Sequence, residues 1–185
     1  MNKVIKAIFL QLYWYVIVYY GSEFQNILLV ISFILVGLNF IFLKPQITKG
    51  HYVFTLILFI LYGLVEESIF SAIGLVDYHQ ESFPLWFTSL WMMFLCYYGD
   101  IFNYLASKSW ILHFFLGGIG GVFAFYGGTK ISSIEAMTSY YYVAIFFSWA
   151  VFYPLSMKVF YGGFMWNKIL DFRIIYSFDQ TGFER

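Results

Sequence analysis

The feature that most constrains this chain is a succession of long apolar stretches that leaves little room for anything else. A bilayer core about 30 Å thick is crossed by roughly 20 apolar residues in a helix that rises about 1.5 Å per residue. Six stretches of about this length follow one another along the 185 residues: 4–20, 26–43, 52–76, 84–106, 110–130 and 139–163. The sequence therefore predicts an all-α, polytopic integral membrane protein folded as a bundle of six transmembrane helices.

The composition agrees with this prediction and excludes a water-soluble fold. Charged residues make up 11% of the chain and hydrophobic residues 62%, whereas a soluble domain has about 25% charged residues. The formal net charge is zero, so the charge balance gives no indication of a nucleic-acid partner. The single cysteine, Cys96, excludes a disulfide framework and a thiolate metal site. We expect neither a metal ion nor a cofactor.

The connections between the apolar stretches are short, so consecutive helices should be antiparallel neighbours. We expect residues 1–163 to form one six-helix transmembrane domain and residues 164–185 to form a cytoplasmic or interfacial tail. Apolar residues recur with helical spacing in the first part of this tail, which favours an interfacial helix to about residue 172.

The distribution of basic residues predicts the orientation, because positive charge is retained on the cytoplasmic side of a membrane. Six spans place both termini on the same side. If that side is the cytoplasm, it holds nine of the ten basic residues, and Lys130 alone lies outside. We therefore expect both termini to be cytoplasmic.

A glycine-rich block in the fifth predicted helix indicates close helix packing. Gly117, Gly121, Ala124 and Gly128 recur at i, i+4, i+7 and i+11, and so lie along one face of a helix. Small residues allow a second helix to approach closely in lipid. A phosphate-binding loop would instead place its glycines at a strand-to-helix turn in water, so we interpret the stripe as a packing surface.

Two adjacent glutamates, Glu66 and Glu67, lie within the third predicted helix. A charged side chain at the bilayer centre costs at least about 2.5 kcal/mol, so each of them needs a physical reason. Glu67 shares its helix face with Gly63 and Ser71 and should point into the bundle. Either a protonated carboxyl bonded to a neighbouring helix or a functional protonation site fits this pattern.

A second group of polar side chains, from all but the third predicted helix, should lie near the cytoplasmic end, as the helical rise indicates. Its members are Gln11, Asn39, Asp100, Asn103, His113 and Lys158. All but Gln11 are candidate ligand-binding residues, and Asp100 and His113 are candidate catalytic residues. Such groups could perform acid–base chemistry, relay a proton or hold a lipid headgroup. The alternative is a structural polar network, with Lys158 extending to water.

Several segments together resemble one family of bacterial inner-membrane proteins. They are residues 11–14, residues 64–68, residues 84–86 with Trp91, and the glycine block with its continuation to Lys130. The family is the one grouped as domain of unknown function 2878, and the resemblance covers residues 5–160. It implies a multi-pass protein of the bacterial inner (cytoplasmic) membrane. Members tend to be encoded near fatty-acid-modifying enzymes, which implies a role in membrane-lipid metabolism.

Three classes of function fit these features. The first is an accessory or lipid-interacting protein in membrane-lipid (fatty-acyl) metabolism, with membrane lipids as partners and a homodimer or larger membrane-protein complex as its assembly. The second is a proton-coupled small-molecule carrier that uses Glu67 and Asp100 at different depths. The third is a membrane-embedded lipid-modifying enzyme with an Asp100 and His113 site. Because no known catalytic sequence pattern is present, we favour the first class and do not expect an enzyme.

Overall fold

The computed structural model describes residues 3–42, 47–79, 85–98, 101–132 and 134–180, and for residues 162–180 it describes the backbone alone. It is an all-α structure of five α-helices, one short 3-10 helix and two strands of two residues each. The elements are α1 (Lys3–Ile41), α2 (Lys49–Ala72), β1 (Val76–Asp77), α3 (Trp86–Leu95), η1 (Phe102–Tyr104), α4 (Trp110–Ile131), β2 (Glu135–Ala136) and α5 (Tyr140–Gln180).

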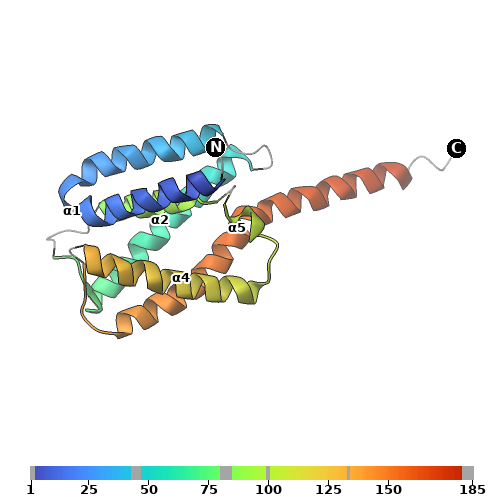
Figure 1. Ribbon diagram of the computed structural model, residues 1–185. Coiled ribbons are helices and arrows are strands. Elements are labelled where there is room, and N and C mark those ends of the chain that lie inside the picture. Colours follow the sequence, from blue (N-terminus) through green and yellow to red (C-terminus); the bar gives the residue numbers. More distant parts are fainter. Residues whose placement is uncertain (1–2, 43–46, 80–84, 99–100, 133, 181–185) are drawn as a thin grey trace.

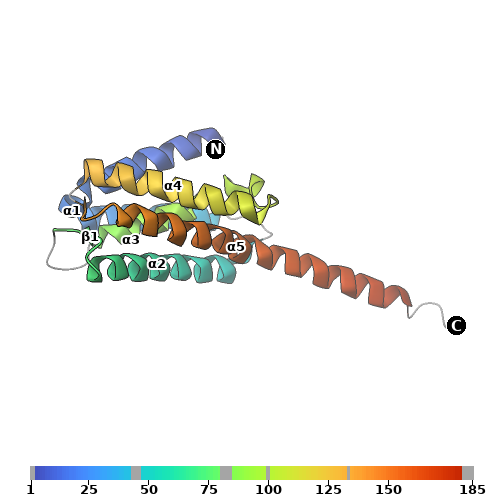
Figure 2. The same ribbon diagram turned by 90° about the horizontal axis from the view of Figure 1, so that it is seen from below.

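Within the described residues, four helices are long and apolar enough to cross a membrane, which indicates a multi-pass membrane protein. They are α1, α2, α4 and the Tyr140–Tyr161 part of α5. Their outward-facing side chains are largely apolar, as Val30, Phe33 and Ile34 of α1 illustrate. The helices pack lengthwise into one bundle, in which α5 lies between α2 and α4 (Figures 1 and 2). The sequence predicted six separate spans, and these four helices do not show that number.

The first two predicted spans lie within α1, which folds back on itself at Phe24 (Figure 1). Phe24 has φ −116° and ψ 28°, a non-helical conformation that bends the helix. The Tyr13 hydroxyl donates a hydrogen bond of 2.7 Å to the Leu28 carbonyl oxygen and lies 3.0 Å from Ser32 Oγ. These bonds hold the two arms of α1 together as an antiparallel hairpin.

The predicted helix over residues 84–106 is wrong in its extent. The α-helix α3 ends at Leu95, and the described residues that follow it form turns and the short helix η1. Trp86, Met92 and Leu95 of α3 are buried by neighbouring helices. Irregular backbone at membrane depth needs partners for its polar groups, and the turns after α3 have them within the chain: Tyr97 N–H donates to the Phe94 carbonyl oxygen and Leu105 N–H to that of Phe102.

Hydrogen bonds place both ends of α1, the start of α2 and Phe160 of α5 at one end of the bundle. Lys6 Nζ donates to Asn39 Oδ1 at 3.0 Å, and Asn39 Nδ2 donates to the Tyr52 hydroxyl at 2.9 Å. The His51 ring nitrogen Nε2 lies 3.1 Å from the carbonyl oxygen of Phe160. At the other end, β1 and β2 form an antiparallel pair in the register Val76↔Ala136 and Asp77↔Glu135.

The last helix differs from the prediction made for the tail. The backbone of α5 remains helical to Gln180, so a helix that ends near residue 172 is not observed. Residues 164–180 instead continue the helix that begins at Tyr140.

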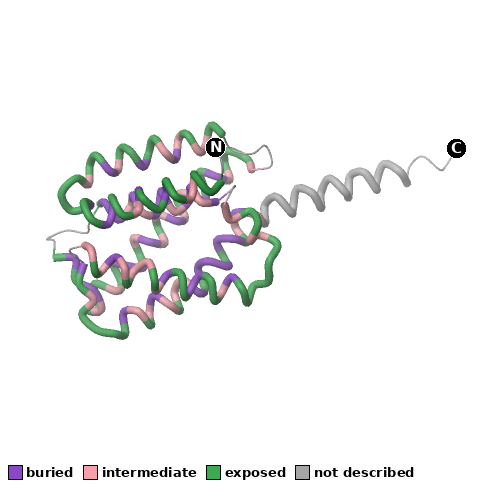
Figure 3. The backbone as a smooth tube through the Cα atoms, in the orientation of Figure 1, coloured by how far each residue is buried: buried purple, intermediate pink, exposed green. Residues whose placement is uncertain are grey.

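At the centre of the core, three tryptophan side chains pack directly against glycines. The indole of Trp86 covers Gly21 of α1, and the indole of Trp91 covers Gly63 of α2 so closely that a Cβ atom at either glycine would overlap the ring. Trp149 of α5 covers Gly121 of α4 in the same way. Figure 3 shows that the buried positions gather on the inward faces of the helices. The glycines therefore allow α3 and α5 to pack closely against their neighbours.

Candidate functional site

The two glutamates of α2 are both buried within the bundle, with exposed fractions of 5% for Glu66 and 0% for Glu67. The sequence predicted that Glu67 would point into the bundle, and the structure buries Glu66 as well. Glu66 is enclosed because α2 packs against α5 on this side: the rings of Tyr62 and Phe152 stack with centroids 4.0 Å apart. We refer to Glu66 and Glu67 as the carboxyl pair.

Two tyrosine hydroxyls donate hydrogen bonds to one oxygen of Glu67. Tyr78, which directly follows β1, donates to Glu67 Oε2, and Tyr141 in the first turn of α5 donates to the same atom at 3.5 Å. Burial, followed by the nearby Glu67 carboxylate, raises the pKa of the Tyr78 phenol well above its usual range. Tyr78 is therefore a neutral hydrogen-bond donor at physiological pH.

Glu66 accepts its hydrogen bond from a tyrosine of its own helix. The Tyr62 hydroxyl, one helical turn earlier, donates to Glu66 Oε1 at 3.2 Å and is also hydrogen-bonded to Ser148. Each carboxyl group thus receives its hydrogen bonds from neutral donors.

Each member of the carboxyl pair also keeps one buried oxygen without a hydrogen-bond partner. These atoms are Glu66 Oε2 and Glu67 Oε1, and the statement holds for the described part of the chain. The two groups are adjacent in α2. Within the described residues, no group of three or more histidine, cysteine, aspartate or glutamate side chains could hold a metal ion. The pair can accept hydrogen bonds and can bind protons.

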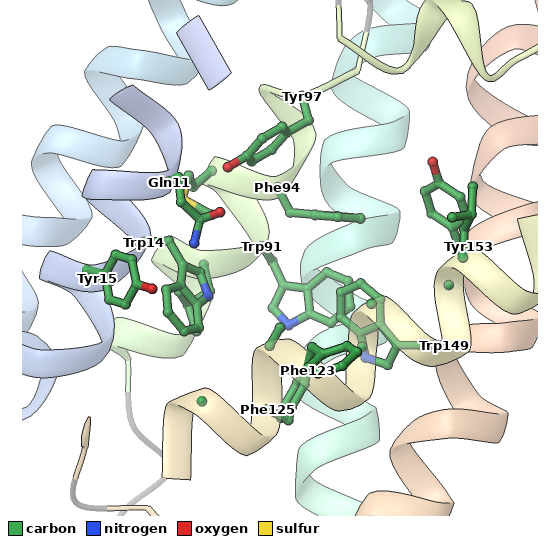
Figure 4. A pocket seen from close by; sticks show the side chains of 18 of the residues that line it. Gln11, Trp14, Tyr15, Trp91, Phe94, Tyr97, Phe123, Phe125, Trp149 and Tyr153 are labelled. Atoms are coloured by element: carbon green, nitrogen blue, oxygen red, sulfur yellow. The ribbon is translucent and has the colours of Figure 1, made fainter. Parts of the chain in front are cut away.

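A second feature is a groove of about 710 Å³ that α1, α3, α4 and α5 enclose between them. Trp14 and Tyr15 of α1 form one side, and the glycine block of α4 forms the other (Figure 4). Aromatic side chains of α3 and α5 form its inner wall, where Trp91 and Trp149 stack with ring centroids 5.3 Å apart. Its polar lining side chains include Gln11 and Lys130.

The aromatic wall separates the groove from the carboxyl pair. Trp149 lines the groove and directly follows Ser148, which is hydrogen-bonded to Tyr62. Trp91, which also lines the groove, contacts Tyr62 with ring centroids 5.4 Å apart. Tyr62, which donates to Glu66 and contacts Trp91, thus links the carboxyl pair to the wall of the groove.

The polar group expected near the cytoplasmic end is only partly described. His113 Nε2 lies 2.7 Å from the carbonyl oxygen of Leu105, and Asn39 has Lys6 and Tyr52 as its partners. Asn103 and Lys158 are exposed, and Gln11 lines the groove. Asp100 lies outside the described residues. The described hydrogen bonds therefore lead from His113 and Asn39 to different partners rather than to one another.

The four small residues of the predicted stripe contact two different neighbours. A Cβ atom at Gly117 would overlap the backbone of Trp149 in α5, and one at Gly121 would lie 2.7 Å from Trp149 Cγ. A Cβ atom at Gly128 would instead lie 3.9 Å from Val18 Cγ1 of α1. Ala124 lines the groove. The stripe thus turns from α5 toward α1 along the length of α4.

The chain belongs to the family described as "Protein of unknown function (DUF2878)", whose model matches residues 3–155. This match confirms the resemblance seen in the sequence. It includes the carboxyl pair and every residue that lines the groove. No curated protein and no solved structure matches the chain.

Proposed function

We propose that this protein binds the acyl chain of a membrane phospholipid in the groove between α1 and α4, as an accessory or lipid-interacting protein of membrane-lipid metabolism. The observation that supports this proposal most directly is the groove itself. Its volume of about 710 Å³ lies within the range of roughly 300–1,000 Å³ that is typical of small-molecule pockets. Its lining is mainly apolar and aromatic.

The surroundings of the groove favour a lipid over a water-soluble ligand. The two helices at its sides, α1 and α4, are both candidate membrane spans, so its open side would face hydrocarbon. The side chains of Tyr15 and Phe123 at its edges are exposed. Lys130, at the end of α4, offers a positive charge to the phosphate of a lipid headgroup while the acyl chain lies along the apolar wall.

Brominated phospholipids provide a direct test, because bromine on an acyl chain quenches nearby tryptophans and Trp14, Trp91 and Trp149 line the groove. Gly120 also lines it, and a Cβ atom there would have no heavy atom within 4 Å. Gly120→Leu should therefore fill the groove without disturbing the fold and should reduce the quenching. Gly37→Leu on α1 is the matched control, since a Cβ atom at Gly37 also meets nothing within 4 Å.

The proposal is supported if Gly120→Leu lowers the quenching and Gly37→Leu leaves it unchanged. Equal quenching in both variants and the parent would contradict it, because ordinary lipid around the bundle would then account for the signal. Water accessibility of the same tryptophans, measured with a soluble quencher such as acrylamide, distinguishes a water-filled carrier path. Efficient acrylamide quenching that Gly120→Leu abolishes would favour the carrier.

We further propose that the protein lies in the bacterial inner membrane and crosses it six times, with both termini in the cytoplasm. The two arms of α1 and the segment from α3 through η1 to the start of α4 would provide the crossings beyond those of α2, α4 and α5. The common location of Lys6, His51 and Phe160 at one end of the bundle supports this arrangement. Reporter fusions at Lys49 and Arg185 should then give cytoplasmic signals and a fusion at Glu81 a periplasmic signal, whereas an external Arg185 would reverse the orientation.

A further inference from the structure

The carboxyl pair of α2 points to a function that is separate from the groove. We propose that Glu66 and Glu67 form a proton-binding site, which holds one proton on one of the two carboxyl groups and exchanges it with the β1–β2 end of the molecule through the Tyr78 hydroxyl. The ligand of this site is the hydrogen ion. The proposal does not depend on a lipid in the groove.

The first step of the argument concerns charge. Two neighbouring carboxylates that have left water repel each other, and in a bilayer each ionised group is costly. The donors that reach the pair are phenols: Tyr62 on α2, Tyr78 after β1 and Tyr141 on α5. From α3, Trp91 contacts Tyr62, and its indole does not titrate. No described lysine, arginine or histidine hydrogen-bonds to the pair, so a proton is the simplest source of compensating charge.

The second step concerns the place where a proton can bind. The phenol hydroxyls reach Glu66 Oε1 and Glu67 Oε2, and they leave Glu66 Oε2 and Glu67 Oε1 without partners among the described residues. Both side chains are more than nine-tenths buried. A buried polar atom without a partner is costly in a purely structural network. A proton can bind one of these oxygens and be lost again without breaking any of the tyrosine hydrogen bonds.

The third step concerns the route to the surface. Tyr78 lies between Asp77 and His79, whose side chains are half exposed, and its own ring is buried. Its hydroxyl reaches Glu67 Oε2. Glu67 lies five residues before the end of α2, which corresponds to about 7.5 Å of helix axis. Because a phenol hydroxyl can both donate and accept a hydrogen bond, Tyr78 can pass a proton between the exposed end and the pair.

Infrared difference spectroscopy of the full-length protein in phospholipid nanodiscs tests the site. A pH step should change the C=O stretching band of a protonated carboxyl, and the change should correspond to one proton per chain. This band should be lost in the double variant Glu66→Gln/Glu67→Gln. Glu23→Gln, which alters an exposed glutamate of α1, is the matched control and should retain it. A band that persists in the double variant would overturn the proposal.

A second variant tests the route and guards against misfolding of the double variant. Tyr78→Phe keeps the ring but removes the hydroxyl. The carboxyl band should remain, while its hydrogen–deuterium exchange should slow about tenfold, as expected when one hydrogen bond of a relay is lost. Unchanged exchange would contradict the route through Tyr78. Tyr15→Phe, which removes an exposed hydroxyl of α1, should leave the exchange rate at the parent value.

Discussion

Helix α4 packs against its two neighbours in different ways, although it presents glycines to both. Toward α5, a Cβ atom at Gly121 would lie 2.7 Å from Trp149 Cγ, which is too close for any real side chain. Toward α1, a Cβ atom at Gly127 would lie 3.7 Å from Trp14 Cη2, an ordinary van der Waals contact. We refer to the first as the closed interface and to the second as the open interface. The comparison teaches that glycine permits close approach but does not enforce it.

The physical reason lies in what drives helices together in lipid. No hydrophobic force between helices exists there, because lipid tails are as apolar as leucine, so association depends on packing. At the closed interface, Trp149 fills the space that the glycines leave. At the open interface, Trp14 and Tyr15 border the groove instead. A gap of this kind costs little in a bilayer if a lipid chain occupies it.

The largest effect should come from enlarging a glycine at the closed interface. Gly121→Leu should lower the free energy of unfolding by about 3 kcal/mol or more, since both the Trp149 ring and the helix axis must move. Chemical denaturation in detergent would measure this change. The neighbouring Gly120→Leu faces the groove and should cost far less. If both variants unfold like the parent, the distinction between the two interfaces fails.

A smaller effect is expected from the carboxyl pair. The pair contacts α5, one of the two helices of the closed interface, through Tyr141. Glu67→Ala leaves the buried hydroxyls of Tyr78 and Tyr141 without their acceptor and should cost about 2 kcal/mol of folding free energy. Glu23→Ala alters an exposed glutamate and should be nearly neutral. Thermal unfolding of the three proteins in the same detergent would compare them. Equal melting temperatures for Glu67→Ala and Glu23→Ala would show that the buried hydrogen bonds contribute nothing.

Tyr13→Phe tests the hairpin that borders the open interface. It removes the hydroxyl that bonds to Leu28 and Ser32 and should lower the unfolding free energy by about 1 kcal/mol, the value of a typical hydrogen bond. Tyr15→Phe, on an exposed side chain of the same arm, should show no loss. A loss as large as that of Gly121→Leu would mean that the α1 hairpin, rather than the α4–α5 contact, limits the stability of the bundle.

The smallest effect should come from the β1–β2 end, outside both interfaces. His79 lies 3.1 Å from Glu135 Oε2 and 3.4 Å from Asp77 Oδ2, with about half of each of the His79 and Asp77 side chains exposed. Exposed ion pairs contribute roughly 0–1 kcal/mol, so His79→Ala should change the unfolding free energy by no more than about 0.5 kcal/mol. Denaturation at low and high salt would check this, because a larger, salt-independent loss would show that these contacts are not screened surface pairs.

Apolar length predicted most of the helices, but it could not predict what surrounds each one. The stretches that became α2, α4 and the first part of α5 were recognised because they are long and uninterrupted. Residues 84–106 form a similarly long apolar stretch, yet α3 ends at Leu95, and its side chains Trp86, Met92 and Leu95 are buried by protein. A hydropathy pattern carries no information on whether the apolar neighbour is lipid or another side chain.

The candidate sites were predictable in a similar, partial way. The two glutamates stand out in any apolar segment, and Tyr62 lies one turn before Glu66, a local signal for its hydrogen bond. Tyr78 and Tyr141 lie 11 and 74 residues from Glu67 in the sequence, too far for a local signal of their hydrogen bonds. Only the pairing of β1 with β2 brings both hydroxyls to Glu67. The groove depends on four helices and has no sequence signature.

The enclosure of α3 has a consequence for biogenesis. Its ten residues span only about 15 Å, half of a bilayer core of about 30 Å. This helix alone therefore cannot insert as a transmembrane helix when it leaves the ribosome. Its partners include Trp149, which is synthesised later. We expect the thiol of Cys96, buried in the finished protein, to react with water-soluble reagents in nascent chains arrested before α5 and to be protected in the complete chain. The order of assembly would then differ from the order of synthesis, with the innermost helix taking its final place after the helices that enclose it.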